Sequence, residues 1–186
     1  EQACRIIITL DCGIRAVDRV KEAKTQGIDV IICDHHLPGS TLPDAHTILN
    51  PKQAGCPYPF KELSGCGVAF KLVQALTDRI GLSPMSAYDG LDLVALSIAS
   101  DLVEATGENR VLLHHGLRTI AQNARPGIKA LLQVVHCEPT HLSVRDIISR
   151  VSPRINAAGR MARATEAVEL LTARGEEHAM KKARDL

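Results

Sequence analysis

The run Val30–Cys33 constrains this chain more than any other stretch, because it ends directly in an acid and two consecutive histidines. A continuous β-branched run without polar alternation is typical of a strand buried on both faces of a parallel sheet. In open α/β sheets, ligands bind beyond the carboxyl ends of such strands. We therefore expect Asp34, His35 and His36 at a functional edge, from which the Pro-Gly pair at 38–39 turns the chain away.

A second strand and a helix precede this one. Arg5–Leu10 is a β-branched run closed by Asp-Cys-Gly at 11–13, and apolar residues then recur at helical spacing over 14–26 before Gly27. Strand, helix and strand within about thirty residues predict a βαβ unit with parallel strands and a right-handed crossover. Because parallel neighbours lie about 5 Å apart, Asp11 and the Asp-His-His tripeptide can converge on one ion.

The rest of the chain predicts one more short strand, Ala45–Leu49, and then mainly helices. The fold class is therefore α/β, a parallel β-sheet flanked by helices, followed by a mainly helical C-terminal part. We expect an α/β domain over 1–110 and a helical continuation over 111–186. Helices are expected over 68–80, 91–102, 110–122, 128–135, 165–171 and 176–186, with a short helix after Ser83-Pro84. Residues 144–149 fit either a strand or a helix start, and 154–163 predicts a basic loop.

Composition narrows the class of protein. No apolar stretch approaches the roughly 18–20 residues that span a bilayer, and no secretory signal opens the chain. The six cysteines show neither a C-x-x-C pair nor zinc-like spacing, so we expect them to be reduced and mostly buried in a cytoplasmic protein. Aromatic residues make up 2% and the net charge is +1, so neither base-stacking platforms nor a global nucleic-acid footprint is expected.

The residues at the predicted sheet edge have more than one interpretation. Alone, the tripeptide at 34–36 is more simply a set of polar loop residues satisfied by hydrogen bonds. Asp11 shifts the balance toward metal, because carboxylate oxygen with imidazole nitrogen suits Mn²⁺ or Mg²⁺ better than a structural zinc site. The alternative for Asp11 is a cap for the helix that starts near Ile14. A second pair, His114-His115, lies mid-helix with no acid nearby in sequence, and we interpret it as structural.

The segment 145–163 is basic. It holds five arginines against the single acid Asp146, and arginine forks bind phosphate bidentately. Asn156 and Gly159 within it suggest close backbone approach to a ligand. The simpler interpretation is a solvated charged loop. The arginines are Arg145, Arg150, Arg154, Arg160 and Arg163.

Four motifs in this order resemble those of the DHH phosphoesterases. They are Asp-Cys-Gly at 11–13, Asp-His-His at 34–36, Ala-Ser-Asp at 99–101 and Pro-Arg-Ile-Asn-Ala-Ala-Gly-Arg at 153–160. Within that superfamily the chain resembles in particular the RecJ-type single-stranded-DNA exonucleases. The connecting segments that carry this similarity are 42–45, 50–52, 56–63, 65–72 and 106–110.

The resemblance implies a hydrolase with a two-metal site, usually Mn²⁺ or Mg²⁺. Asp11 would bridge the metals, while His35 and Asp101 would bind one of them. His36 would contact the scissile phosphate or stabilise the developing charge, and Asp34 would orient the histidines. In isolation Asp101 is an ordinary helix-end acid, and its assignment depends on the resemblance.

The same resemblance implies how substrate is held. Arg154, Asn156 and Arg160 would grip phosphates, so 145–163 would be a substrate-binding loop. Another backbone loop near the site would be formed by Ser64, Gly65 and Gly67. The implied activity is 5′→3′ degradation of single-stranded DNA in repair and recombination, with a single-stranded-DNA-binding protein and a repair helicase as further partners and no membrane.

The chain departs from the family pattern at its start. The first motif, an aspartate-rich strand end, has no match among the ten residues before Asp11, and the C-terminal domains of the exonucleases have no match either. We therefore expect an N-terminally truncated fragment that lacks part of the second metal's ligands and can be inactive alone. Two alternatives stay open: a DHH enzyme for small substrates such as short oligonucleotides, cyclic dinucleotides or pyrophosphate, and a non-catalytic binding module.

Overall fold

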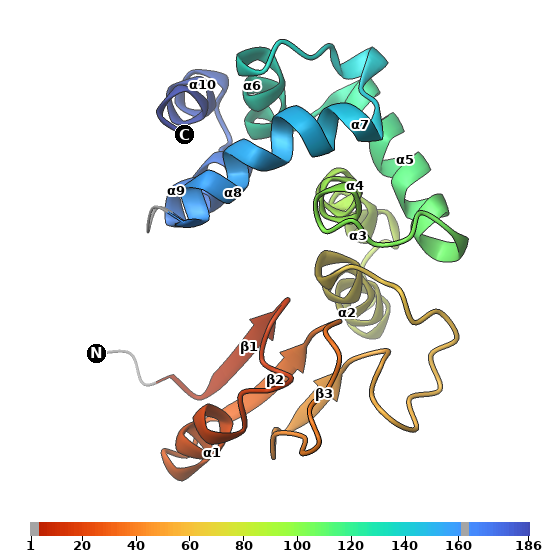
Figure 1. Cartoon of the computed structure of the whole chain (residues 1–186), viewed down its shortest axis with the longest axis vertical. Coiled ribbons are helices and arrows are strands. Elements are labelled where there is room, and N and C mark those ends of the chain that lie inside the picture. Colours follow the sequence, from red (N-terminus) through yellow and green to blue (C-terminus); the bar gives the residue numbers. More distant parts are fainter. Residues whose placement is uncertain (1–3, 161–163) are drawn as a thin grey trace. The chain divides into compact units, whose positions relative to one another are not determined.

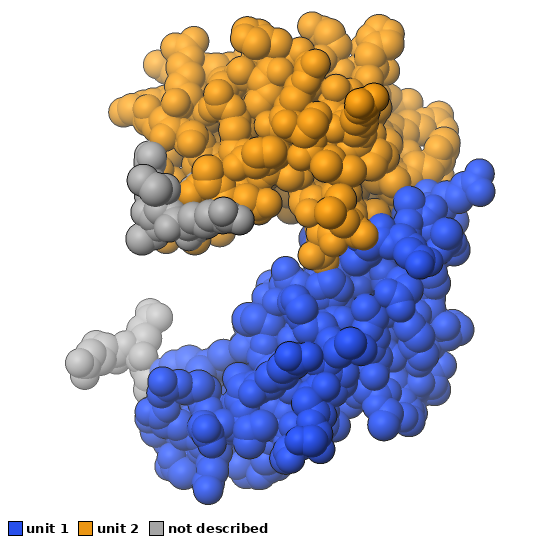
Figure 2. Space-filling model, in the orientation of Figure 1, with its two compact units in different colours: residues 1–90, 103–111 blue, residues 91–102, 112–186 orange. Residues whose placement is uncertain are grey.

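The computed structural model describes residues 4–160 and 164–186 of the chain, with the side chains of 158–160 left out (Figure 1). The chain divides into two compact units (Figure 2). Unit 1 comprises Glu1–Gly90 with Val103–Val111, and unit 2 comprises Leu91–Leu102 with Leu112–Leu186. Among the described residues, no helix is long and apolar enough to cross a membrane.

Unit 1 is built on a parallel three-stranded sheet. Its strands β1 (Ile6–Leu10), β2 (Asp29–Cys33) and β3 (Thr47–Leu49) lie in the order β1-β2-β3. Leu10 is opposite Cys33, and Cys33 is opposite Leu49, so the three strands end level with one another. The predicted parallel sheet is confirmed, and the residues that follow each strand meet at one edge (Figure 1).

Helix α1 (Val17–Thr25) returns the chain from β1 to β2, as the predicted βαβ unit requires. Val20 on this helix packs against Val30 and Ile32 of β2. The helix starts three residues after Ile14, because a turn in which the N–H of Ala16 donates to the Gly13 carbonyl at 2.9 Å comes first.

Strand β1 is more exposed than its β-branched sequence predicted. A β-branched run of this kind is typical of a buried strand, but Ile6 and Leu10 are 57% and 54% exposed. Within the described residues β1 pairs along one edge alone, with β2, whereas β2 has a neighbour on each side. Apolar character therefore predicted the strand and not its burial.

Helix α2 (Gly65–Arg79) begins earlier than the sequence suggested and is followed by the short α3 (Met85–Tyr88). The Ser64 hydroxyl caps α2 by accepting the N–H of Gly67 at 3.1 Å. The expected loop over Ser64, Gly65 and Gly67 is thus wrong, since these residues form the cap and first turn of a helix. A serine N-cap outweighs the low helix propensity of the two glycines.

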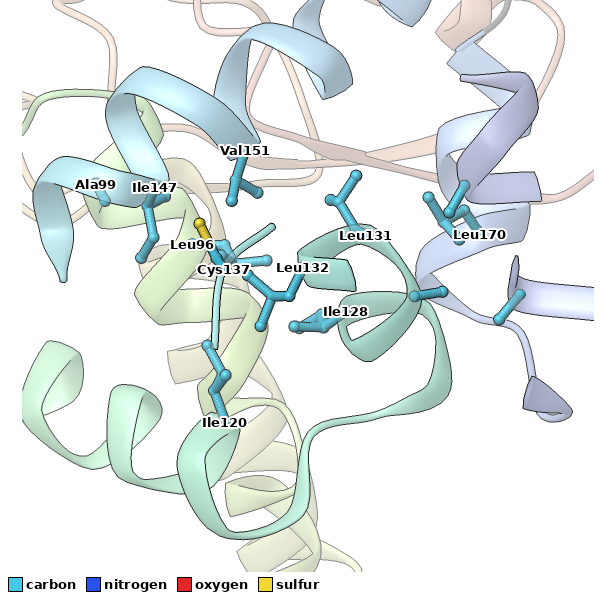
Figure 3. Packing of buried hydrophobic residues seen from close by; sticks show 13 residues of the cluster. Leu96, Ala99, Ile120, Ile128, Leu131, Leu132, Cys137, Ile147, Val151 and Leu170 are labelled. Atoms are coloured by element: carbon cyan, nitrogen blue, oxygen red, sulfur yellow. The ribbon is translucent and has the colours of Figure 1, made fainter. Parts of the chain in front are cut away.

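The regular elements of unit 2 in its described part are all helices, and they enclose an apolar core (Figure 3). Leu96 on α4, Ile128 and Leu131 on α6, and Leu170 on α9 are among its buried members. The helices are α4 (Leu91–Ser100), α5 (Gly107–Asn123, whose first turn belongs to unit 1), α6 (Pro126–Val134), η1 (Pro139–His141), α7 (Val144–Asp146), η2 (Ile147–Val151), α8 (Ser152–Arg160), α9 (Ala164–Leu171) and α10 (Glu176–Asp185).

The basic segment 145–163 is helical over its described part, so the predicted loop is wrong. Helices α7, η2 and α8 follow one another from Val144 to Arg160, and η2 is a π-helical turn. The start is a capping box between Ser143 and Asp146, which settles the open choice at 144–149 in favour of helix. Ile147 and Val151 supply the helical apolar face by entering the core (Figure 3). Arg163 lies outside the described residues.

The cysteines are all free thiols in the structure, as expected for a reduced protein. The expectation that most are buried is wrong. Cys33 and Cys137 are buried, Cys4 and Cys12 are exposed, and the other two are partly covered.

Gly116 sets how closely α5 approaches α4 within unit 2. A Cβ atom at this position would lie 2.3 Å from the Leu91 carbonyl oxygen and 2.5 Å from the Cβ atom of Ala95. We expect Gly116→Ala to lower the free energy of unfolding by about 1–3 kcal/mol through overpacking, as measured by urea denaturation. Gly175→Ala is the matched control, because no atom lies within 4 Å of its added Cβ. Equal effects of both substitutions would contradict this packing role.

Candidate functional site

Asp11 follows β1 in a backbone conformation that is unusual for a residue other than glycine. Its φ is +62°, in the left-handed region that aspartate tolerates better than most residues. Its N–H still donates to the Cys33 carbonyl at 2.8 Å, which extends the ladder between β1 and β2 by one bond. The Thr9 hydroxyl donates to the Cys12 carbonyl at 2.8 Å and holds the turn. These bonds fix where the Asp11 side chain leaves the sheet.

The Asp11 carboxylate rests against the first residue of α2. A Cβ atom on Gly65 would lie 2.0 Å from Asp11 Oδ1 and 2.4 Å from its Cγ, which no real side chain could tolerate. Gly65 therefore makes room for the carboxylate at the amino end of α2, where the helix dipole favours negative charge. The sequence marked this glycine as part of a site, and the structure shows the steric reason.

His35 points its Nε2 atom at the same carboxylate. Its Nδ1 lies 3.0 Å from the backbone carbonyl oxygen of Leu63, which can accept but not donate, so Nδ1 carries the proton. Nε2 lies 3.1 Å from Asp11 Oδ1, and in a neutral ring both atoms carry lone pairs. A proton or a metal ion between them relieves that repulsion. Fixing one ring nitrogen on a carbonyl is also how metal-binding histidines are oriented.

Asp34, the residue after β2, is buried and accepts four hydrogen bonds. Oδ2 accepts the N–H of Ile14 at 2.9 Å, while Oδ1 accepts the N–H groups of His35 and His36 at 2.8 and 3.1 Å and the His36 Nδ1 at 2.7 Å. Burial by itself would raise the pKa of this carboxyl, but the hydrogen bonds outweigh it and hold the pKa below its ordinary value. Asp34, and not Asp11, thus binds the N–H of Ile14.

His36 is held from two sides while more than half of its side chain stays exposed. Asp34 fixes Nδ1, which leaves Nε2 available toward solvent. The buried Asn50 donates through Nδ2 to the His36 carbonyl at 2.9 Å and accepts the N–H of Lys52 at 2.8 Å. The rings of His35 and His36 meet edge to face, with centroids 4.6 Å apart. Each ring therefore has its own anchor.

Three side chains can share one ion. One ligand atom each from Asp11, His35 and His36 lies within 4.8 Å of the other two. Their donor set is one carboxylate oxygen with imidazole nitrogens and no thiolate, which suits Mn²⁺, Mg²⁺ or Zn²⁺ in a site open to further ligands. The residues present therefore fit a divalent cation.

The remaining predicted site residues belong to unit 2. Asp101 continues the last turn of α4, where its N–H donates to the Ser97 carbonyl at 2.9 Å. Ser100 shares a 2.6 Å hydrogen bond with the buried Ser152, at the start of α8. Arg154 and Asn156 follow on the same helix, half-buried and exposed respectively, and the Arg160 side chain lies outside the described part. The Ser100–Ser152 bond thus links the segment of Asp101 to that of Arg154.

Two residues that form hydrogen bonds with the histidines, Leu63 and Asn50, were not identified from the sequence. The Leu63 carbonyl orients His35, and a backbone atom leaves no trace in side-chain type. Asn50 was not singled out as a site residue, although a polar residue directly after the expected strand Ala45–Leu49 was an available signal. Both also line a cavity of about 580 Å³ between β3, the 50–58 segment and α2. Asp11, His35 and His36 do not line it, so it is separate from the candidate metal site.

Comparison with known protein families agrees with this geometry. The model of the family described as "DHH family, N-terminal domain" matches residues 3–98, which include Asp11 and the Asp-His-His tripeptide. The chain belongs to the DHH family.

Proteins similar in sequence to this chain include single-stranded-DNA-specific exonucleases called RecJ. The Salmonella typhimurium protein is 43% identical over 91% of this chain and the Bacillus subtilis protein 43% identical over 92%. The chain spans 31% and 21% of their lengths. Among solved structures, RecJ from Thermus thermophilus in complex with Mn²⁺ matches 97% of this chain and 26% of its own, with TM-score 0.85 and 32% identity. An exonuclease RecJ bound to manganese matches 97% and 45%, with TM-score 0.84 and 32% identity.

Asp34 makes a pH-dependent contribution to stability whose sign follows from its lowered pKa. The carboxylate stabilises the fold fully above the unfolded-state pKa of about 3.9, and this stabilisation is lost as pH falls through the lower folded-state pKa. We expect Asp34→Asn to lower the free energy of unfolding at pH 7 by about 1.5–3 kcal/mol, the value of a hydrogen bond to a charged group. Urea denaturation at pH 7 and pH 3 should show the difference shrink in acid. A difference independent of pH would contradict the assignment.

Gly65 offers a second test, because its missing side chain makes room for Asp11. We expect Gly65→Ala to displace the carboxylate and weaken Mn²⁺ binding roughly ten- to hundredfold, as changes around metal ligands do. The helix itself should remain, since alanine favours it. Gly67→Ala, two residues later, is the control, because its Cβ would meet Leu63 and Ser64 at an ordinary 3.4 Å. Isothermal titration with Mn²⁺ measures both variants, and equal losses would show that the effect is not steric pressure on Asp11.

Proposed function

We propose that this chain is the central catalytic segment of a metal-dependent phosphodiesterase, a RecJ-type exonuclease that degrades single-stranded DNA from the 5′ end. The observation that carries the proposal is the convergence of Asp11 and His35 at the level ends of β1 and β2. Membership in the DHH family and 43% identity to RecJ exonucleases support the reaction class. A role in DNA repair and recombination is part of the same proposal.

The residues divide into those that hold metal and those that act on substrate. Asp11 and His35 would hold Mn²⁺ or Mg²⁺, with Asp101 completing the set by family resemblance. Bound there, the ions would supply a nucleophilic water and would stabilise the attacking and leaving oxygens of an in-line displacement. Within this chain Gly65 leaves space for Asp11, and Leu63 keeps the proton of His35 on Nδ1, so that Nε2 faces the ion.

His36 and Asp34 form a pair suited to the reacting phosphate. Asp34 keeps the His36 ring in place through a 2.7 Å hydrogen bond to Nδ1. In the protonated ring, the exposed Nε2 can donate to a phosphate oxygen or stabilise the charge that develops there. Because its hydrogen bonds outweigh burial and hold the pKa of Asp34 below its ordinary value, this carboxylate stays ionised for this role at neutral pH.

Substrate strands would be held by arginine forks and an amide on α8. Arg154 and Arg160 carry charge for phosphate, and Asn156 lies within the same helical stretch. The substrate class is single-stranded DNA, as the names of the relatives state for those proteins. A single-stranded-DNA-binding protein and a repair helicase are proposed as functional partners of the whole protein.

Digestion of end-labelled single-stranded DNA tests the proposal. We expect Mn²⁺-dependent release of label from 5′-labelled strands before 3′-labelled ones, reversal by a chelator, and no release by Asp11→Asn. Asp18→Asn is the matched control, because it removes an equal charge from the first turn of α1. Full activity of Asp11→Asn would contradict the site assignment.

The same assay separates the alternatives. Mn²⁺-dependent hydrolysis of pyrophosphate, cyclic dinucleotides or very short oligonucleotides, without digestion of longer strands, would identify an enzyme for small substrates. Failure on every phosphoester, together with no Mn²⁺ binding, would favour a non-catalytic module. Asp11→Asn and its control Asp18→Asn serve in each of these assays as well.

A further inference from the structure

Arg15 joins the loop after β1 to the loop after β2. Its Nε donates to the backbone carbonyl oxygen of Leu37 at 2.9 Å. The preceding residue, Ile14, donates its N–H to Asp34 Oδ2 at 2.9 Å. Two successive residues of one loop therefore bind the other loop just before and just after the two histidines.

This bond places the guanidinium beside His36. Leu37 is the next residue, and consecutive Cα atoms are about 3.8 Å apart, so the guanidinium is held within about one residue of the His36 backbone. Arg15 is exposed. The bond to Leu37 uses one of five N–H donors, and the four on the two Nη atoms remain for a ligand. An arginine anchored through Nε is already ordered before it binds.

Four other cations of unit 1 pair with carboxylates, whereas Lys61, like Arg15, donates to a backbone carbonyl, that of Cys56 at 2.8 Å. Arg19, in the first turn of α1, pairs with Glu22 at 3.0 Å, and Lys52 pairs with Glu62 at 3.1 Å. Lys24 and Lys71 contact Asp44 and Glu108. Arg15 has no carboxylate partner among the described residues, and its anchor is an uncharged carbonyl. Its full positive charge therefore faces solvent next to the loop that follows the Asp-His-His tripeptide.

We propose that Arg15 binds a phosphate of the substrate strand, adjacent to the phosphate that reacts at Asp-His-His. The planar fork and delocalised charge of arginine suit bidentate phosphate binding. Such a contact positions a strand without reading its bases, so its effect is the same for every sequence. This inference deepens the proposed function, on which it rests, and assigns a phosphate-binding residue to the loop that carries Asp11.

Substitution by glutamine separates binding from structure. Glutamine places its Nε2 at the same bond position as the arginine Nε, so Arg15→Gln can keep the hydrogen bond to Leu37 while it removes the charge and the fork. Arg19→Gln is the matched control, because it removes an equal charge four residues later, in the first turn of α1. Affinity for a fluorescent single strand of about 12 nucleotides, within the site sizes of single-strand-binding folds, is measured in the Asp11→Asn background, which leaves the probe intact, over a range of NaCl concentrations.

We expect Arg15→Gln to weaken binding roughly three- to tenfold at low salt and to lower the slope of log affinity against log salt by about 0.7, the value for one phosphate contact on a single strand. Arg19→Gln should match the parent, and poly-dT and mixed sequences should respond alike. A purely structural Arg15 would leave affinity and slope unchanged in Arg15→Gln but not in Arg15→Ala. That result, or absence of strand binding by the parent, would overturn the inference.

The proposed function fails by a different measurement. It is overturned if the protein with Asp11 intact shows no Mn²⁺-dependent hydrolysis of DNA, whatever Arg15 does to affinity. Loss of salt slope in Arg15→Gln together with absent hydrolysis would leave a phosphate-binding residue in a protein that binds strands without cleaving them. The hydrolysis assay therefore tests the proposed function, and the affinity assay tests the role of Arg15.

Discussion

The site depends first on the register between β1 and β2. Leu10 pairs with Cys33, so both strands end at the same level and the next residue of each emerges at one edge of the sheet. A shift by one residue would turn the side chains of β1 to the other face and separate Asp11 from His35. The bond from the Asp11 N–H to the Cys33 carbonyl extends this register into the site itself. Backbone pairing, more than any side-chain contact, brings the two ligands together.

Polar groups gathered at this edge must each find a partner, because an unsatisfied buried donor or acceptor costs about 1–3 kcal/mol. The structure meets this requirement for most of these groups by anchoring the two histidine rings and the loop backbone on different residues. The buried His35 Nε2 instead faces the carboxylate of Asp11, an acceptor rather than a hydrogen-bond donor. Leu63 holds His35, Asp34 holds His36, and Asn50 holds the backbone between strand and loop. No anchor is shared by the two rings, so one histidine can face an ion while the other faces substrate. The two roles proposed for adjacent residues follow from these different attachments.

Much of this arrangement could be predicted from sequence, and the failures have physical causes. Hydrophobic runs and glycines located β1, α1 and β2, and parallel pairing then implied that Asp11 meets His35. Periodicity could not reveal that β1 lies at an edge of the described sheet, because burial depends on neighbours along the sheet. The segment 145–163 was interpreted from its charges, with Asn156 and Gly159 inside it, whereas the structure makes it helical with Ile147 and Val151 buried. Local composition was outweighed there by packing.

The π-helical turn η2 connects that packing to the proposed chemistry of unit 2. A π turn inserts an extra residue per turn and shifts the face that the following helix presents. Here it brings Ser152 within 2.6 Å of Ser100, while Ile147 and Val151 remain in the core with Leu96 and Ala99. Asp101 and Arg154, which we propose to bind metal and phosphate, thus lie one and two residues from a shared hydrogen bond. The same stretch of chain therefore keeps Ile147 and Val151 in the core and Ser152 in contact with Ser100, so packing and polar contact are both satisfied there.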